Sequence, residues 1–220
     1  MNLHTDLRNM DKFLNFDRVL CLSPHPDDVE YSMAGTILKY QDTHFDIVCL
    51  TQGGDCDTTT NMSRLDEVVS VWRESNVNNF SLYFTSYKLL KELGEDEWVN
   101  YIEREYILKN DYNCIVTPSQ YDSHFEHKIV CNLGYALTRI SPISLIEYYS
   151  PSTLETWVPN VFIDITEHYD VKIKMLQMFK SQLHRSYFNE SILKEFHTNF
   201  RCSKRNVKLI EQFKFKQIFL

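Results

Sequence analysis

The segment from Ser23 to Asp28, Ser-Pro-His-Pro-Asp-Asp, places an imidazole and two adjacent carboxylates directly after the apolar run Val19 to Leu22. Polar groups at the end of a buried strand need partners, because burying them unpaired costs free energy. In an open α/β sheet, ligands bind just beyond the carboxyl ends of the strands. His25 and Asp28 offer a nitrogen and an oxygen of the kind that zinc accepts. We therefore interpret this segment as half of a metal site.

A second group of polar residues, Asp-Ser-His-Phe-Glu-His from Asp122 to His127, follows another apolar run, residues 113 to 117. His124 and His127 are three residues apart at the start of a predicted helix, so their side chains project from the same side of it. Because both polar segments follow predicted parallel strands, we expect them at the same edge of the sheet.

Three protein ligands with an open fourth position are typical of catalytic zinc. We therefore predict one divalent metal per chain, with zinc preferred over other divalent metals. Two adjacent carboxylates do not easily both stay ionised without a cation between them, and a metal supplies that charge. One aspartate then binds the metal while Asp27 and His124 stay beside it. The predicted ligands are His25, Asp28 and His127.

A structural interpretation competes with this one. Ser123 and Glu126 are three residues apart at a predicted helix start, as in a capping box, where the serine caps the helix and the glutamate returns to the serine amide. That motif would explain Ser123 and Glu126. It would leave His124 and His127 unexplained, so the metal site is the preferred interpretation.

The rest of the chain predicts strands that alternate with helices, which implies parallel βαβ units with helices on both faces of the sheet. The prediction is a single α/β domain, residues 1–220, with a Rossmann-like, mainly parallel sheet and a C-terminal extension. It contains no Gly-x-Gly-x-x-Gly fingerprint, so dinucleotide binding is not predicted. Predicted strands cover residues 18–22, 45–51, 81–85, 113–117, 144–149 and 160–165; predicted helices cover 29–40, 63–76, 97–108 and 123–139, with two more in 168–199 and a break near 186–189.

Composition narrows the class of protein. The 220 residues are 43% hydrophobic and 24% charged, as in ordinary globular proteins, and the formal net charge is -7. A nucleic-acid partner is not expected, because phosphate binding needs clustered Lys and Arg. The sequence shows no secretion signal and no apolar run long enough for a transmembrane segment, so a cytoplasmic location is expected. The six cysteines are scattered, which favours reduced, mostly buried thiols.

The last twenty residues carry six Lys or Arg side chains against Glu211 alone. Such a run suits a phosphate-bearing substrate or a membrane surface, although a solvated face is the commoner explanation. The alternation Phe-Lys-Phe-Lys at residues 213 to 216 predicts an edge strand whose lysines face solvent.

The His-Pro-Asp-Asp segment, followed by Gly35-Thr36, resembles the signature of the PIG-L/LmbE-like N-deacetylases, zinc enzymes that remove acetyl from N-acetylglucosaminyl compounds. The resemblance spans most of the chain, and the His-Pro-Asp-Asp segment together with the Asp122 to His127 segment makes it specific. One departure is that Phe125 and Glu126 stand where the family has Pro and Asp. The other matching segments are Thr51 to Gly54, Arg64-x-x-Glu67 and Asp122 to His127.

The resemblance implies roles for the remaining residues. Asp27 would be the general base, and protonated His124 would stabilise the oxyanion. Arg64 would bind substrate hydroxyls or phosphate, with a surface ion pair to Glu67 as the alternative. Glu126 and Asp122 would support the site, with Glu126 either orienting the neighbouring histidine or capping the helix.

The implied substrate is a small N-acetyl amino sugar of the GlcNAc type, such as a glycoside, a nucleotide sugar or a glycoconjugate precursor. A binding protein that keeps the metal and sugar pocket with little or no catalysis is one alternative, suggested by Phe125 and Glu126. A phosphoester hydrolase is another, although such enzymes commonly use two metals. Four aromatic residues are candidate pocket walls or, more commonly, core residues: Tyr121, Tyr148, Tyr149 and Trp157.

Overall fold

The computed structural model describes residues 12–53, 63–198 and 207–219, in which strands and helices alternate as predicted. The strands are β1 (Arg18–Ser23), β2 (His44–Cys49), β3 (Phe80–Phe84), β4 (Cys114–Pro118), β5 (Ser144–Tyr148), β6 (Val161–Asp164) and β7 (Ile210–Gln217). The α-helices are α1 (Asp28–Lys39), α2 (Arg64–Glu74), α3 (Glu95–Glu105), α4 (Phe125–Leu137), α5 (Tyr169–Leu176) and α6 (Glu190–Phe196). Short 3-10 helices are η1 (Phe13–Asn15), η2 (Leu90–Glu92), η3 (Ile107–Lys109) and η4 (Ser186–Phe188).

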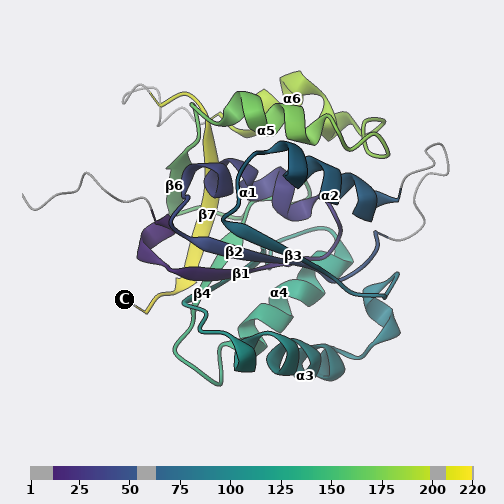
Figure 1. Cartoon of the computed structure of the whole chain (residues 1–220), viewed down its shortest axis with the longest axis vertical. Coiled ribbons are helices and arrows are strands. Elements are labelled where there is room, and N and C mark those ends of the chain that lie inside the picture. Colours follow the sequence, from purple (N-terminus) through teal and green to yellow (C-terminus); the bar gives the residue numbers. More distant parts are fainter. Residues whose placement is uncertain (1–11, 54–62, 199–206, 220) are drawn as a thin grey trace, which may run out of the picture.

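The strands form one seven-stranded sheet in the order β3-β2-β1-β4-β5-β7-β6. The pairs from β3 to β5 are parallel, whereas β7 runs antiparallel to both β5 and β6. Helices α1, α2, α5 and α6 lie on one side of the sheet, and α3 and α4 lie on the other (Figure 1). The predicted single α/β domain with a mainly parallel sheet is therefore confirmed.

The order of the strands explains where a site can form. The chain builds β1, β2 and β3 toward one edge and then returns to place β4 on the other side of β1. Val19 of β1 pairs in parallel with Cys114 of β4, so both strands end at the same edge of the sheet. Loops after strands on either side of such a reversal diverge and leave a crevice between them. The two polar segments follow these two strands.

Two hydrophobic cores hold the layers together. On one face, Met33 and Ile37 of α1 are fully buried, as their helical spacing predicts. On the other face, Trp98 of α3 and Leu133 of α4 are buried in a separate cluster. The central strands β1 and β4 supply side chains to both clusters, which fixes the position of the loops that follow them.

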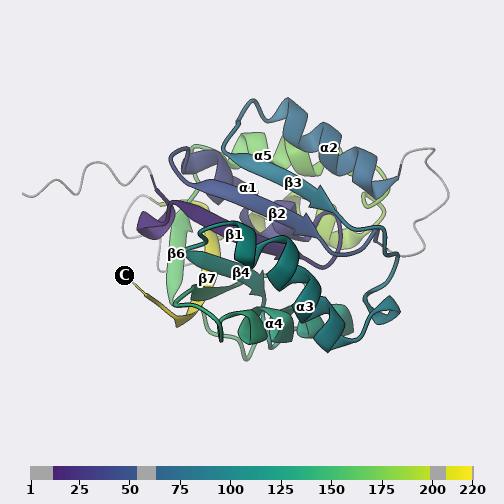
Figure 2. The ribbon, with the colours of Figure 1, turned by 60° about the horizontal axis from the view of Figure 1, so that its bottom comes forward.

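The prediction that residues 213 to 216 form an edge strand is wrong. Strand β7 lies between β5 and β6, and β6 forms the border of the sheet (Figure 2). Lys216 lies 2.8 Å from the side-chain oxygen of Gln120 and 3.5 Å from Glu147, and both Lys214 and Lys216 are half-buried. Alternating Phe and Lys indicate a strand with two unlike faces, but they do not reveal which strands pair with it.

The boundaries of helices α1 to α4 each differ from the predicted ones by one to three residues. Helix α3 stops at Glu105 and continues as the 3-10 helix η3, and helix α4 begins two residues later than predicted. Four cysteines are free and buried, as expected: Cys21, Cys49, Cys114 and Cys131. Residues 1–11, 54–62, 199–206 and 220, which include Gly54 and half of the basic C-terminal run, lie outside the described residues. Within the described parts, no helix has the length and apolar character needed to cross a membrane.

A buried polar cluster joins the C-terminal strand to helix α1. Glu211 of β7 accepts hydrogen bonds from the backbone nitrogens of Gly35 and Thr36 at 2.8 and 2.7 Å. Its carboxylate also lies 2.6 Å from the Lys172 ammonium, which in turn donates to His197 Nε2 at 2.8 Å. Because Lys172 donates to Nε2 and the backbone oxygen of Leu193 lies 2.6 Å from Nδ1, His197 is neutral with its proton on Nδ1.

This arrangement predicts a pH effect on stability. Burial, and then the charge of Lys172, lower the pKa of His197 well below its usual value. Above pH about 6.5 the ring is neutral in both the folded and unfolded chain, so its contribution to stability is fully present. As pH falls below that value, only the unfolded chain takes up the proton, and stability is lost. As the pH falls from 7.5 to 5.5, the free energy of unfolding measured with urea should therefore decrease more in wild type than in the His197→Gln variant. Parallel curves for the two proteins would contradict this.

Candidate active site

The loop after β1 folds back on itself through Asp28. The Asp28 carboxylate accepts a hydrogen bond from the backbone nitrogen of His25 at 2.8 Å, and the same oxygen lies 3.0 Å from His25 Nδ1. Between them, Asp27 adopts φ = 145°, a conformation that side-chain-bearing residues rarely adopt. Such strained positions are maintained only where the surrounding structure enforces them, and they cluster at functional sites.

The loop after β4 is organised by Asp122, which is fully buried. One of its carboxylate oxygens accepts a hydrogen bond from the backbone nitrogen of His124 at 2.8 Å, just before helix α4 begins. Ser123 instead donates its hydroxyl to the backbone oxygen of Ser152 at 2.9 Å. The helix has no side-chain cap, so the capping-box interpretation of Ser123 and Glu126 is wrong.

The two loops bring His25, Asp28 and His127 together. One donor atom from each of these residues lies within 4.8 Å of the others, which is the spacing of a metal-binding group. The Asp28 carboxylate is central: one oxygen faces His25 Nδ1, and the other lies 3.2 Å from His127 Nε2. Their function as ligands is still a prediction, but the structure places the three side chains as that prediction requires.

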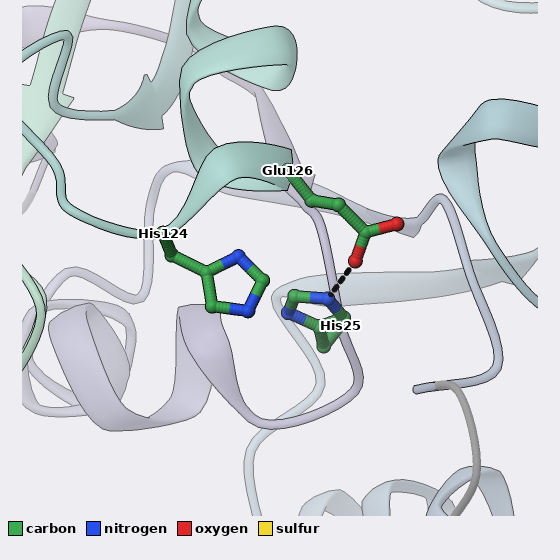
Figure 3. A group of neighbouring side chains, drawn as sticks. All are labelled: His25, His124 and Glu126. Carbon is green, nitrogen blue, oxygen red and sulfur yellow. Dashed lines mark hydrogen bonds and ion pairs between the residues drawn. The ribbon is translucent and has the colours of Figure 1, made fainter.

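Each histidine of this group is held by a second carboxylate on its other ring nitrogen. Asp122 lies 3.0 Å from His127 Nδ1, and Glu126 lies 2.6 Å from His25 Nε2 (Figure 3). The second Glu126 oxygen accepts a hydrogen bond from the backbone nitrogen of Leu90 at 3.0 Å, which fixes the glutamate. Glu126 thus orients His25 and not its neighbour His124. Carboxylates that hold the outer nitrogen of a histidine are typical of metal sites.

The electrostatics of the group favour a cation. Burial opposes charge on both imidazoles, but Asp28 together with Glu126 at His25 and Asp122 at His127 outweighs burial and raises the pKa of His25 to about 9 and that of His127 to about 10. Burial alone would raise the pKa of Asp28, but the two neighbouring histidines hold it well below its usual range. The carboxylates therefore draw positive charge to this point, and a divalent metal would supply it while leaving the facing nitrogens unprotonated.

Asp27 is buried beside this group but is not one of its three members. One of its carboxylate oxygens accepts a hydrogen bond from Arg64 at 3.0 Å. Burial, with a smaller contribution from Asp28, raises the pKa of Asp27 to about 6, even though Arg64 opposes the shift. A carboxylate with a pKa in this range is ionised near neutrality and still basic enough to accept a proton, as a general base requires.

Arg64 connects Asp27 to two other segments. Its guanidinium donates to the backbone oxygen of Gly53 at 3.2 Å and contacts the side-chain oxygen of Gln182 closely. Gly53 has φ = 90°, and a Cβ there would lie 2.6 Å from the Arg64 side chain, so this position needs glycine. The surface ion pair with Glu67 is excluded, because both Arg64 and Glu67 are buried and Glu67 accepts hydrogen bonds from Ser181.

His124 stands at the open side of the group. Its ring centre lies 4.9 Å from that of His25 and 4.7 Å from that of His127. Burial, followed by the positive charge of the two neighbouring histidines, lowers the pKa of His124. His124, His25 and Glu126 also have donor atoms within 4.8 Å of one another, but the hydrogen bond between His25 Nε2 and Glu126 already occupies two of these atoms (Figure 3).

Every site residue predicted from the sequence except Asp122 lines one cavity of about 330 Å³. Its aromatic walls are Tyr31, Tyr187 and Phe188, and none of the four aromatic residues proposed from the sequence contributes to it. Tyr148 and Trp157 are buried core residues instead. Tyr31 follows Asp28 by one helical turn, a spacing that could have revealed it. Gly53 belongs to the matching segment Thr51 to Gly54, whereas the lining residues that the sequence did not point to are Tyr31, Pro151, Ser152, Arg185, Tyr187 and Phe188.

Comparisons with known proteins agree with this picture. Residues 20–138 match the PIG-L family, described as GlcNAc-PI de-N-acetylase. The matched region includes both polar loops and Arg64. A diacetylchitobiose deacetylase of Thermococcus kodakarensis is 24% identical over 198 residues, which cover 80% of this chain and 74% of that protein.

Solved structures share the fold. The N,N'-diacetylchitobiose deacetylase of Pyrococcus horikoshii matches with a TM-score of 0.67 and 22% identity, covering 96% of this chain and 87% of that one. GalB, a 4-carboxy-2-hydroxymuconate hydratase of Pseudomonas putida, matches with a TM-score of 0.69 and 16% identity, covering 93% of this chain and 98% of that one. Because a deacetylase and a hydratase share this fold, the reaction has to be argued from the site residues.

Proposed function

This chain belongs to the PIG-L family of GlcNAc-PI de-N-acetylases, and on that premise we propose that it is a metal-dependent hydrolase that removes acetyl from a GlcNAc-type N-acetyl amino sugar. The observation that carries the proposal is the convergence of His25, Asp28 and His127 beside a buried carboxylate, Asp27, that the metal group does not use. A reducing compartment such as the cytoplasm suits the free, buried thiols of this chain.

The donor set supports one divalent metal per chain. His25 Nδ1, the Asp28 carboxylate and His127 Nε2 face one another, and two nitrogens with one oxygen are a donor set that zinc accepts. When bound, the metal supplies Lewis acidity, which lowers the pKa of water and polarises the acetamide carbonyl. Asp122 and Glu126 hold the two imidazoles in the orientation that leaves these nitrogens directed inward.

Asp27 and His124 handle the protons. Asp27 accepts a proton from the attacking water as the water oxygen bonds to the acetamide carbon. In its protonated form, His124 donates a proton to the nitrogen as the carbon–nitrogen bond breaks, and acetic acid and the free amine leave. The lowered pKa of His124 makes its protonated ring a stronger acid. The proton held by Asp27 must then return to His124 before the next turnover.

Arg64 positions the base. Its hydrogen bond to Asp27 holds the carboxylate ionised and fixes its direction within the cavity. Because Arg64 also lines the cavity, we retain a contact with a substrate hydroxyl as part of the proposal.

The test is an assay of the zinc-loaded protein against a panel of N-acetylated sugars, nucleotide sugars and glycosides, with both acetate and free amine measured. Release of the two products in equal amounts from at least one GlcNAc compound is expected. A chelator should abolish the release, and zinc should restore it. Protection from thermal unfolding by these compounds without any acetate release would instead identify a binding protein.

A further inference from the structure

The cavity holds a second arginine, which the proposed reaction does not use. Arg185 lines the same space as the metal group, on the side formed by Tyr31, Tyr187 and Phe188. It belongs to the segment between α5 and α6, which supplies no residue to the metal group. Its position is set by the backbone: its nitrogen donates to the backbone oxygen of Gln182 at 2.9 Å, and its own carbonyl accepts from Phe188 at 3.0 Å.

The charge of Arg185 is available to a ligand. Its side chain is exposed, hydrogen-bonds the Tyr187 side chain and, through its charge, opposes the rise in the pKa of Asp27 that burial causes, but among the described residues no carboxylate lies within ion-pair distance of it. The guanidinium carbon lies 5.9 Å from the centre of the Tyr187 ring, which supports the side chain along one wall. Arg64 differs, because its guanidinium is engaged with Asp27, Gln182 and Gly53.

A second hollow continues the cavity past Arg185. It measures about 390 Å³ and shares both Arg185 and Phe188 with the first cavity. Its remaining lining is largely polar and includes His184, Asn189 and Glu190. Arg185 therefore borders both the space where the acetamide would react and a space large enough for a further substituent.

We propose that Arg185 binds an anionic group, a phosphate or a carboxylate, that the amino-sugar substrate carries next to its sugar ring. The inference rests on the proposed deacetylase function and specifies its substrate class. Arginine presents its donors in a planar fork that matches both anions, and such charge-assisted hydrogen bonds are the stronger kind. A neutral glycoside would leave this guanidinium solvated.

The test compares three GlcNAc compounds that differ in one substituent: the methyl glycoside, the 1-phosphate and a glycoside whose aglycone ends in a carboxylate. Arg185→Gln should raise KM for the preferred anionic compound on the order of 10- to 100-fold, with little change in kcat. The methyl glycoside should be almost unaffected. Arg185→Lys should retain part of the preference, and the two anionic compounds reveal which anion is bound.

The matched control is Lys180→Gln, which removes an exposed positive charge from the same segment but outside both cavities. It should leave the preference unchanged. Equal losses on neutral and anionic compounds in Arg185→Gln, or no loss on any, would overturn the inference.

A binding measurement separates this inference from the proposed reaction. Glucosamine 1-phosphate should protect the zinc-loaded protein from thermal unfolding more than glucosamine does, and Arg185→Gln should remove the difference. That result without turnover of any substrate would reject the deacetylase function while retaining the anion site. Equal protection of the wild type by the two compounds, together with equal turnover of neutral and anionic substrates, would reject the anion site alone.

Discussion

Replacing Asp27 by Asn should leave the metal bound and lower kcat by roughly 10²- to 10⁴-fold, the range typical for loss of a general base. The amide keeps the shape of the side chain and an oxygen that can accept from Arg64, but it no longer takes up a proton. Asp27 is not part of the metal-binding group, so metal content should stay at the wild-type level. The measurements are metal content after dialysis and kcat on the GlcNAc compound that is turned over fastest.

The backbone at Asp27 makes Asn a suitable replacement. Asn has nearly the size and branching of Asp, so it should occupy this positive-φ position as Asp27 does, and the variant should fold without a large loss of stability. An unchanged thermal midpoint is the control. Full activity at equal metal content would exclude Asp27 as the base.

Replacing Asp28 by Ala should remove the metal itself and, with it, all activity. The Asp28 carboxylate faces both histidines and also accepts from the His25 backbone, so its loss removes one ligand and releases the loop that positions another. Metal affinity measured with a competing chelator should fall far more than the roughly 10- to 100-fold expected for removing an outer-shell partner.

Glu126→Gln provides the graded comparison for this prediction. It removes the charge that holds His25 Nε2 while leaving all three donor residues in place. Metal affinity should then fall by roughly 10- to 100-fold, and activity should return at high metal concentration. An Asp28→Ala protein that binds metal as tightly as Glu126→Gln would contradict the assigned ligand set.

The position of the site could be predicted from the sequence because it depends on two local patterns and one general rule. Each polar loop follows a short apolar strand, and parallel strands on either side of a reversal end at one edge. That rule alone predicts that His25 and His127 lie close together. Strand β7 could not be placed in the same way, because its neighbours are decided by long-range pairing that its own alternation does not encode.

The role of Glu126 shows a different limit. A serine and a glutamate three residues apart have the spacing of a cap, and only the position of His25, 101 residues away in sequence, decides that the glutamate reaches into the site. Arg185 and Tyr187 are cavity residues that the sequence likewise did not predict. They lie in an irregular segment without a motif, and they join the cavity only because the fold brings that segment to the edge of β1.

The hydrogen bonds from Gly35 and Thr36 to Glu211 also have a consequence for biosynthesis. Glu211 lies 176 residues downstream of Gly35, and at roughly 5 to 20 residues per second it emerges from the ribosome on the order of ten seconds or more after helix α1. During that interval, the nascent chain already contains His25 and Asp28 at the start of helix α1, but Glu211, which accepts hydrogen bonds from this helix, has not yet been synthesised. Tight metal capture should therefore be a late event, completed only when the downstream strand has joined the sheet.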